Sequence, residues 1–215
     1  MSKKIQLDIV SDVVCPWCVV GYKNLQKAID ELGMEDKINL QWQPFELNPN
    51  MPPEGQDLRE HVAQKYGSSL EESEQARLNI TERGAEVGFT FNYFDKMRMV
   101  NTRDAHILLE YAYEQGQQTA LKLALFKAAF TDQKDVSNQQ TLLNEVEELG
   151  LNSQQAKARL AMPEYRQKVI DHEGYWQGLG ISAVPTVVFN RQSALSGAQP
   201  VEAYKQVLLE LAAEL

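Results

Sequence analysis

The sequence contains only two cysteines among its 215 residues, and they stand two residues apart as Cys15 and Cys18. Secreted domains that are held together by disulfides carry several cysteines spread along the chain. The pattern found here therefore excludes a disulfide-stapled scaffold. A single CxxC pair instead indicates thiol chemistry or metal binding.

Long hydrophobic runs are also missing. No apolar stretch approaches the ~18 residues that a transmembrane helix needs. The first ten residues, MSKKIQLDIV, contain two lysines and then alternate between polar and apolar residues, so they lack the continuous apolar core of a signal peptide. We therefore expect a soluble cytoplasmic protein.

Basic residues are in the minority, because 21 Lys and Arg face 30 Asp and Glu and give a formal net charge of -9. A chain with this balance is not attracted over long range to a phosphate backbone or to anionic lipids. We therefore expect neither nucleic acid nor a membrane as a partner.

The N-terminal pattern predicts a strand, a helix and a second strand. Residues 5–10 are apolar enough to form a buried strand. Pro16 suits the first turn of a helix, where its missing N–H does no harm, and apolar residues then continue at helical spacing to Gly33. Residues 38–42 alternate in polarity and predict a second strand, parallel to the first. The CPWC motif therefore lies between a strand and a helix.

A proline-rich loop separates this βαβ unit from a long helical region. Four of the eight prolines fall between Pro44 and Pro53, where regular structure is disfavoured. Helical periodicity marks six segments after this loop: 58–66, 71–87, 102–115, 119–130, 139–149 and 164–178.

Strand character returns near the end of the chain. Residues 186–190 and 194–196 predict two strands, and residues 201–213 predict an amphipathic helix that begins after Pro200. The predicted order is therefore βαβ, a helical block and ββα, which is an α/β fold.

The CPWC segment has the arrangement that disulfide exchange requires. The thiolate is the reactive form of cysteine, and the unpaired N–H groups at a helix N-terminus favour this anion at Cys15. Cys18 lies one turn further along, within reach of a mixed disulfide formed at Cys15. We therefore predict that Cys15 is the nucleophile and that Cys18 is the resolving thiol.

Two other uses of a CxxC pair are weighed against this prediction. A zinc site needs two further ligands, but the sequence has no second CxxC and its three histidines stand singly. Covalent haem attachment requires histidine directly after the second cysteine, where Val19 stands. We therefore predict no metal and no bound cofactor beyond a redox-active disulfide.

A second motif, AVPT at residues 183–186, precedes the C-terminal strand. A proline at the first residue of a strand is common and is usually in the trans form. Together with an N-terminal CPWC, however, this proline resembles one that a known family places opposite its CxxC motif.

The chain resembles the DsbA-like branch of the thioredoxin superfamily, in which a CxxC motif follows the first central strand and a cis-proline loop lies opposite. It is similar in particular to the cytoplasmic FrnE-type members through four motifs in order: PFELNP (44–49), NTRDAH (101–106), AVPT (183–186) and SGAQP (196–200). The resemblance spans nearly the whole chain.

This resemblance implies a thioredoxin fold interrupted by a large all-helical insertion. Residues 1–50 and 179–215 would form the discontinuous thioredoxin-like domain, and residues 51–178 would form the insertion. Pro185 would be the cis-proline, and the Val184 backbone would pair with an extended substrate segment beside Cys15. The implied activity is protein dithiol–disulfide exchange on protein or peptide thiols, with glutathione as a further partner.

Some members of the family carry a second, C-terminal cysteine pair that this chain lacks, so a relay through a second internal disulfide is excluded. The dipeptide Pro16–Trp17 also differs from those of well-known thioredoxins, isomerases and oxidases. The direction of exchange stays open, because these two residues tune the redox potential. Homodimerisation is expected only by analogy.

Two alternative functions come from other classes. Kappa-class glutathione transferases and 2-hydroxychromene-2-carboxylate isomerase share the helical insertion, but they typically have serine at the position of Cys15, and Cys18 would have no task in them. A non-catalytic peptide-binding or chaperone-like protein would use the same groove without turnover.

Several further residues are candidates for accessory roles. Asp12 either accepts a proton from Cys18 or turns the chain before the helix. Trp17 either contacts substrate or packs at the domain junction. Asn101 is a helix-capping candidate, as is Thr102, and His106 is expected to face the boundary between insertion and thioredoxin-like domain. The aromatic segment 89–94 is interpreted mainly as core of the insertion, with a groove wall as the alternative.

Overall fold

The computed structural model describes residues 4–214. Strand β1 (Ile5–Ser11), helix α1 (Pro16–Leu32) and strand β2 (Ile38–Pro44) form the first unit, with a short 3-10 helix at Glu35–Lys37 before β2. The two strands are parallel, with Ile5 opposite Ile38. The predicted βαβ unit is therefore confirmed.

Helix α1 ends as predicted at Gly33, whose φ of 59° lies in the left-handed region that glycine tolerates.

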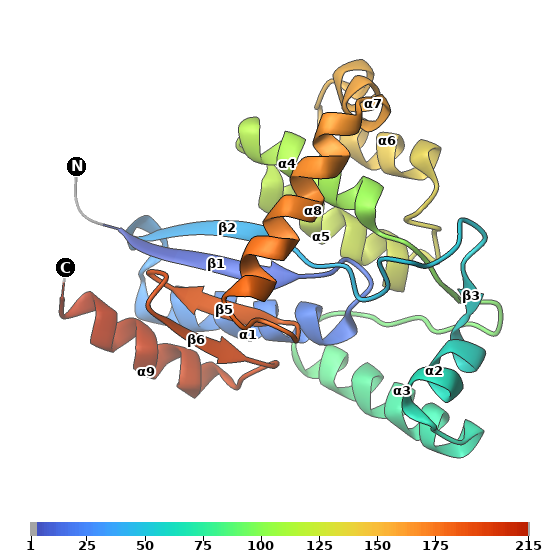
Figure 1. Ribbon diagram of the computed structural model, residues 1–215. Coiled ribbons are helices and arrows are strands. Elements are labelled where there is room, and N and C mark those ends of the chain that lie inside the picture. The colour runs from blue at the N-terminus through green and yellow to red at the C-terminus, as the bar shows by residue number, and fades with distance from the viewer. Residues whose placement is uncertain (1–3, 215) are drawn as a thin grey trace.

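The C-terminal part completes a four-stranded sheet (Figure 1). Strands β5 (Thr186–Phe189) and β6 (Ser193–Ser196) extend the sheet in the order β2-β1-β5-β6, and β5 is antiparallel to both of its neighbours. Helix α9 (Val201–Ala212) packs beside α1 on one face of this sheet. The structure thus confirms the predicted ββα ending and the thioredoxin-type order of elements.

The insertion between β2 and β5 is mostly helical, and α8 crosses the sheet on the face opposite α9 (Figure 1). Its helices are α2 (Leu58–Tyr66), α3 (Leu70–Glu86), α4 (Arg103–Glu114), α5 (Gln118–Phe130), α6 (Gln139–Glu148), α7 (Ser153–Ala161) and α8 (Pro163–Gly178). Two short strands, β3 (Gln56–Asp57) and β4 (Arg98–Met99), pair antiparallel beside them.

Three of these elements, α7, β3 and β4, differ from the sequence prediction. Helix α7 was not predicted because it buries only Ala156 and Leu160, too few apolar positions to show a period; Asn152 caps its first turn instead. The insertion was predicted to be all-helical, but β3 and β4 form a ribbon inside it. Strands of two residues are too short to show alternation, so their sequence carries no signal.

The sheet has an apolar face and a mixed face. Ile5, Leu7 and Ile9 of β1 lie in the main hydrophobic core together with residues of α1 and α9. On the opposite face, Val10 packs with Trp176 of α8 and with a valine of β5 in a smaller cluster. Both faces of the sheet are therefore covered, as expected for a thioredoxin-type layer arrangement.

The insertion is attached directly to the edge strand of the sheet. The side-chain amide of Gln118 on α5 accepts a hydrogen bond from Trp42 N at 2.9 Å and donates one to Trp42 O at 3.0 Å. The indole of Trp42 donates to the Thr119 hydroxyl. Gln118 thus satisfies edge groups of β2 that would otherwise be unpaired.

One continuous hydrophobic core runs through the sheet, α1 and most helices of the insertion. Trp42 lies at the contact between them, with its ring centroid 4.9 Å from that of Tyr22 and 6.0 Å from that of Phe126. Within residues 4–214, no helix is both long enough and apolar enough to cross a membrane.

Candidate active site

Cys15 and Cys18 stand where the first strand turns into the first helix. Asp12 O accepts a hydrogen bond from Cys15 N at 3.3 Å, and Cys15 is the N-cap residue of α1 with no side-chain cap. Cys18 is completely buried, whereas Cys15 keeps 4% of its surface exposed. Cys15 is therefore the less buried of the two.

The two thiols ionise as one unit because they hydrogen-bond to each other. Burial alone would raise the pKa of Cys18, but the Cys15 thiol, the neighbouring Ser11 hydroxyl and the charge of Lys122 lower it below the ordinary thiol value. The pKa of Cys15 is raised well above that value by the interaction with Cys18 and by burial. The stabilised thiolate of the pair is therefore that of Cys18, contrary to the sequence expectation that the helix N-terminus favours the anion at Cys15. Cys15 keeps the part of nucleophile because it is the less buried of the two.

The AVPT segment lies against this pair. The Cys15 thiol donates to Val184 O at 3.8 Å, although 169 positions separate the two residues in the chain. The Val184–Pro185 peptide bond is cis. Val184 is half-buried and Pro185 is buried, and Pro185 O accepts a hydrogen bond from Gly197 N at 2.7 Å. The fold thus brings both motifs of the sequence analysis to one place.

Gly21 makes this approach feasible. A Cβ atom at this position would lie 3.0 Å from Cγ of Pro185 and 3.3 Å from Cα of Ala198. Gly21 stands one turn after Cys18 on α1, so its missing side chain lets the helix pack tightly on the proline loop (183–185) and on the SGAQP segment.

Asp12 is buried and does not cap α1. Its carboxylate accepts a hydrogen bond from Leu47 N at 2.7 Å and lies 3.4 Å from Nε2 of His106. Burial alone would raise the pKa of Asp12, but His106, the Leu47 N–H and the Lys122 charge hold it below its usual value. Asp12 therefore stays ionised at neutral pH and adds a negative charge near Cys15.

His106 lies at the boundary between the insertion and the sheet, as the sequence analysis expected. Its Nε2 is 3.1 Å from Phe45 O in addition to the contact with Asp12. Asn101 does not bind any cysteine. Its amide donates to Glu46 at 2.8 Å, and its carbonyl oxygen accepts from Arg103 N at the start of α4.

Three charged residues beside this group were missed by the sequence analysis. Buried Glu46 accepts from Arg103 Nε at 2.7 Å, and both stand in the quoted motifs PFELNP and NTRDAH. Glu173 on α8 faces Glu46, and burial together with that carboxylate raises the pKa of Glu173 to about 8. No pattern in the sequence marks Glu173, because α8 has no clear apolar stripe.

Trp17 and Pro16 flank the nucleophile on the helix. Both are half-buried, and Trp17 packs against the main hydrophobic core. The structure therefore places a half-buried Trp17 two residues after Cys15, packed in part against the core. The substrate contacts that the sequence analysis assigned to Trp17 stay a prediction.

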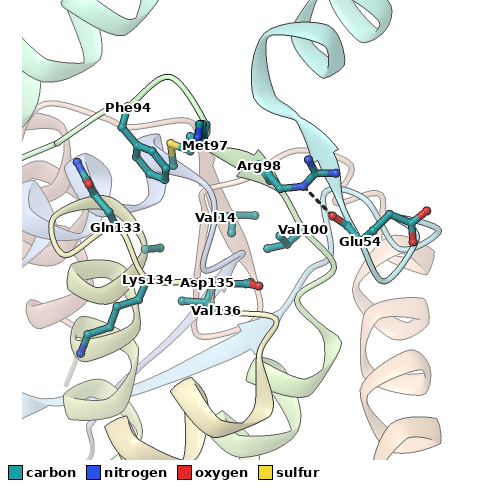
Figure 2. Close-up of a pocket in the computed structure, with 12 residues that line it drawn as sticks. Val14, Glu54, Phe94, Met97, Arg98, Val100, Gln133, Lys134, Asp135 and Val136 are labelled. Atoms are coloured by element: carbon teal, nitrogen blue, oxygen red, sulfur yellow. Dashed lines mark hydrogen bonds between the residues drawn. The ribbon is translucent and has the colours of Figure 1, made fainter.

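A cavity of about 140 Å³ opens next to Val14, the residue before Cys15. Figure 2 shows Val14, Val100 and Val136 converging on it, with Phe94 and Met97 on one side. Phe91, in contrast, is buried and packs on Phe89 and Phe130. Most of the aromatic segment 89–94 is thus core, as the main interpretation expected, and Phe94 lines the cavity. A part for this segment in a substrate groove stays a prediction.

Charged groups surround this apolar cavity. Arg98 is fixed by a hydrogen bond of 2.7 Å from its Nε to Glu54 O, which Figure 2 shows, and Lys96, Lys134 and Asp135 also line the opening. The cavity therefore combines an apolar floor with a charged rim.

The described residues contain no cluster of three or more His, Cys, Asp or Glu side chains that could hold a metal ion. The CxxC pair has neighbours of another kind: a hydroxyl from Ser11, an ammonium from Lys122 and the backbone of Asp12. These groups stabilise a sulfur anion, so the arrangement can support thiolate chemistry.

Comparison with known proteins agrees with this geometry. The family model of the DSBA-like thioredoxin domain matches residues 6–209. The crystal structure of a probable DsbA oxidoreductase, SCO1869 from Streptomyces coelicolor, is similar over 98% of this chain and 91% of that chain. The two share 30% identity, with a TM-score of 0.91.

Two more distant structures share the fold. The cytosolic disulfide reductase DsbM from Pseudomonas aeruginosa is 18% identical, with a TM-score of 0.69 over 98% of this chain and 100% of that one. A structure of the same reductase with GSH has a TM-score of 0.59 at 20% identity, with the same coverage. A 2-hydroxychromene-2-carboxylate isomerase is 12% identical, with a TM-score of 0.72 over 97% of both chains.

Proposed function

Because the chain belongs to the family of DSBA-like thioredoxin domains, we propose that it is a dithiol–disulfide oxidoreductase whose redox centre is Cys15 and Cys18. The observation that carries the proposal is the thiol pair at the start of α1, with its thiolate stabilised and with Val184 and Pro185 directly opposite.

The reaction proceeds in two exchange steps. The Cys15 thiolate attacks one sulfur of a substrate disulfide, so that a Cys15–substrate bond forms and the other substrate sulfur leaves as a thiolate. The Cys18 thiolate then attacks Cys15 Sγ, and the first substrate sulfur leaves. The protein ends with a Cys15–Cys18 disulfide, and the substrate has gained two electrons and two protons. Oxidation of a substrate dithiol is the same sequence in reverse.

The backbone of Val184 supports binding of an extended substrate segment. Its carbonyl accepts from the Cys15 thiol in the free protein, so a peptide strand that pairs with Val184 would lie directly beside the attacking sulfur. The cavity at Val14 is suited to hold a neighbouring apolar side chain of that peptide. Proteins and peptides are therefore the proposed substrates.

Glutathione is the proposed small-molecule partner. Support comes from the similar structure of DsbM with GSH, and the description of that reductase as cytosolic supports a cytoplasmic location for this chain. The FrnE-type assignment and homodimerisation stay predictions.

Glutathione-dependent transfer or isomerisation is the second candidate, and the similarity to 2-hydroxychromene-2-carboxylate isomerase favours it. At 12% identity this likeness concerns the fold alone. The second cysteine, buried and surrounded by groups that stabilise its thiolate, has a task in disulfide exchange and none in such a transferase.

Purified protein tests the proposal in an insulin-reduction assay driven by glutathione and in oxidation of a reduced peptide. We expect turnover in at least one assay with the wild-type protein and none with Cys15→Ser. Full activity in Cys15→Ser, or conjugation of glutathione to an electrophile without any disulfide exchange, would select the alternative.

A further inference from the structure

Lys122 is a fully buried lysine on α5 that has no carboxylate partner. Its side chain is 0% exposed, and none of the ion pairs found within residues 4–214 includes it. Removing an ammonium from water without a counter-charge is costly. The neighbours of Lys122 must therefore include groups that stabilise its positive charge.

The contacts of this ammonium point towards the redox centre. Its Nζ donates to Ser11 O at 3.4 Å and lies 5.2 Å from the ring centroid of Trp42 and 5.1 Å from that of Phe126. Ser11 is the last residue of β1, four positions before Cys15. The cation thus lies beside two aromatic rings at the strand end that leads into the CPWC motif.

The Ser11 hydroxyl is a second group without a partner. It is buried and makes no hydrogen bond to any described residue in the free protein, yet it is positioned to donate to the sulfur of Cys18. A buried hydroxyl without a partner is unfavourable unless an acceptor becomes available. A thiolate at Cys18 is such an acceptor.

The charged and titratable groups around Lys122 come from three elements. Cys18 and Cys15 on α1 and Asp12 after β1 all favour its charged form, whereas burial lowers its pKa to about 8. His106 and Glu110 on α4 line the same small cavity as Lys122. Asp12 accepts from Leu47 and contacts His106, and of the neighbouring charges that of Cys18 favours the charged form of Lys122 most.

We infer that Lys122 and the Ser11 hydroxyl form a built-in site for the Cys18 thiolate, and that Lys122 is the positioning residue that activates the resolving cysteine. The inference rests on the proposed function. It gives the insertion a direct part in the chemistry, because α5 delivers the cation to a redox pair that belongs to the sheet and to α1.

The step concerned is the second exchange. Cys18 releases its proton to solvent and forms a thiolate, whose electron pair makes the bond to Cys15 Sγ. The bond from Cys15 Sγ to the substrate sulfur breaks, and that sulfur leaves with the electron pair and takes up a proton from solvent. Lys122 keeps its proton throughout and acts only through its charge.

Reaction of the reduced protein with Ellman's reagent separates the two steps by stopped flow. Attack by Cys15 releases one thionitrobenzoate, and attack by Cys18 on the mixed disulfide releases the second. In Lys122→Met we expect the second phase to slow about tenfold at pH 7, which corresponds to one pKa unit at Cys18. Its pH profile should move to higher pH, while the first phase changes less than threefold.

Lys127→Met is the matched control. Lys127 stands five residues further along the same helix, is exposed and pairs with Asp132, so its replacement should leave both phases unchanged. Ser11→Ala keeps the cation and removes the hydroxyl, and it should also slow the second phase. This variant tests the site even if Lys122→Met fails to fold, which circular dichroism would show.

A second phase in Lys122→Met and Ser11→Ala with wild-type rate and pH profile would overturn the inference. That outcome differs from failure of the proposed function, in which the wild-type protein itself would release no second thionitrobenzoate.

Discussion

At the scale of single residues, Glu173 is a buried carboxyl group on α8 whose raised pKa keeps it protonated. The carboxyl group is buried, and one of its oxygens has no hydrogen-bond partner among the described residues. Burial raises its pKa to about 8, and the negative charges of Glu46 and Asp12 act in the same direction. Glu173 is therefore mostly protonated at neutral pH.

We predict that Glu173→Gln makes the protein less sensitive to alkaline pH. The pKa of Glu173 is raised on folding, so the folded state binds more protons than the unfolded state between about pH 4.5 and pH 8, and its stability falls as pH rises through this window. At pH 8 the free energy of unfolding of the variant should exceed that of the wild type by about 1 kcal/mol, after allowance for solvent screening. At pH 5 the two proteins should differ little in stability.

Urea unfolding of both proteins at pH 5 and pH 8 measures this difference. Glu164→Gln, on the exposed first turn of the same helix, is the control and should show no such dependence on pH. An equal effect of Glu173→Gln at both pH values would show that its carboxyl group does not titrate in this window.

The motif residues of the site could be predicted from the sequence, and its buried charges could not. Cys15, Cys18 and Pro185 stand in short motifs whose order is informative. Lys122 and Glu173 stand in ordinary helical sequence, and what gives them a role is the tertiary contact with Ser11 or Glu46. For Lys122 one signal existed, because Leu125 and Phe126 follow it at helical spacing and place it on the buried face of its helix.

At the scale of elements, close packing around glycines fixes the insertion as well as the active site. Gly84 lies within α3, where a Cβ atom would approach Phe89 O to 2.8 Å and collide with the ring of Phe91. Gly174 lies within α8, and a Cβ atom there would meet nothing within 4 Å. A side chain at Gly84 would therefore collide with its neighbours, whereas a side chain at Gly174 would have free space.

We predict opposite effects of replacing these glycines by alanine. Gly84→Ala should cost about 1–3 kcal/mol, because the rigid backbone and ring of the aromatic segment must shift. Gly174→Ala should gain about 0.5–1 kcal/mol from helix propensity alone. Chemical denaturation of both variants gives the sign directly, and stabilisation by Gly84→Ala would contradict the packing described here.

The strands of the βαβ unit and every predicted helix lie within two residues of their predicted bounds. This agreement includes α2 and α8, which have no clear apolar stripe, because turn residues such as Gly67 and Pro163 mark where these helices begin or end. Helix α7 and the β3–β4 ribbon depend on capping and on two hydrogen-bonded pairs, so their positions are set by neighbours rather than by patterning.

At the scale of the whole molecule, the insertion and the thioredoxin-like part share one core. Trp42 of β2 contacts Phe126 of α5, Gln118 pairs with the edge of the sheet, and Trp176 of α8 packs on its opposite face. We therefore propose that residues 51–178 and the two flanking segments do not fold independently.

This arrangement predicts a single cooperative unfolding transition. Fluorescence of Trp42 and Trp176 reports on contacts between the two parts, whereas far-ultraviolet circular dichroism is dominated by helices of the insertion. Denaturant curves from the two signals should coincide, as they do in two-state unfolding. Separate midpoints would show that the insertion can unfold while the sheet stays intact.

The central claim is that Cys15 is the sulfur that meets the substrate. Trapping tests it most directly: Cys18→Ser is incubated with a peptide disulfide, and the site of attachment is identified by mass spectrometry. We expect a mixed disulfide at Cys15 in this variant and no comparable adduct at Cys18 in Cys15→Ser. The claim would be contradicted if the two variants formed adducts at the same rate, Cys15→Ser at Cys18 and Cys18→Ser at Cys15.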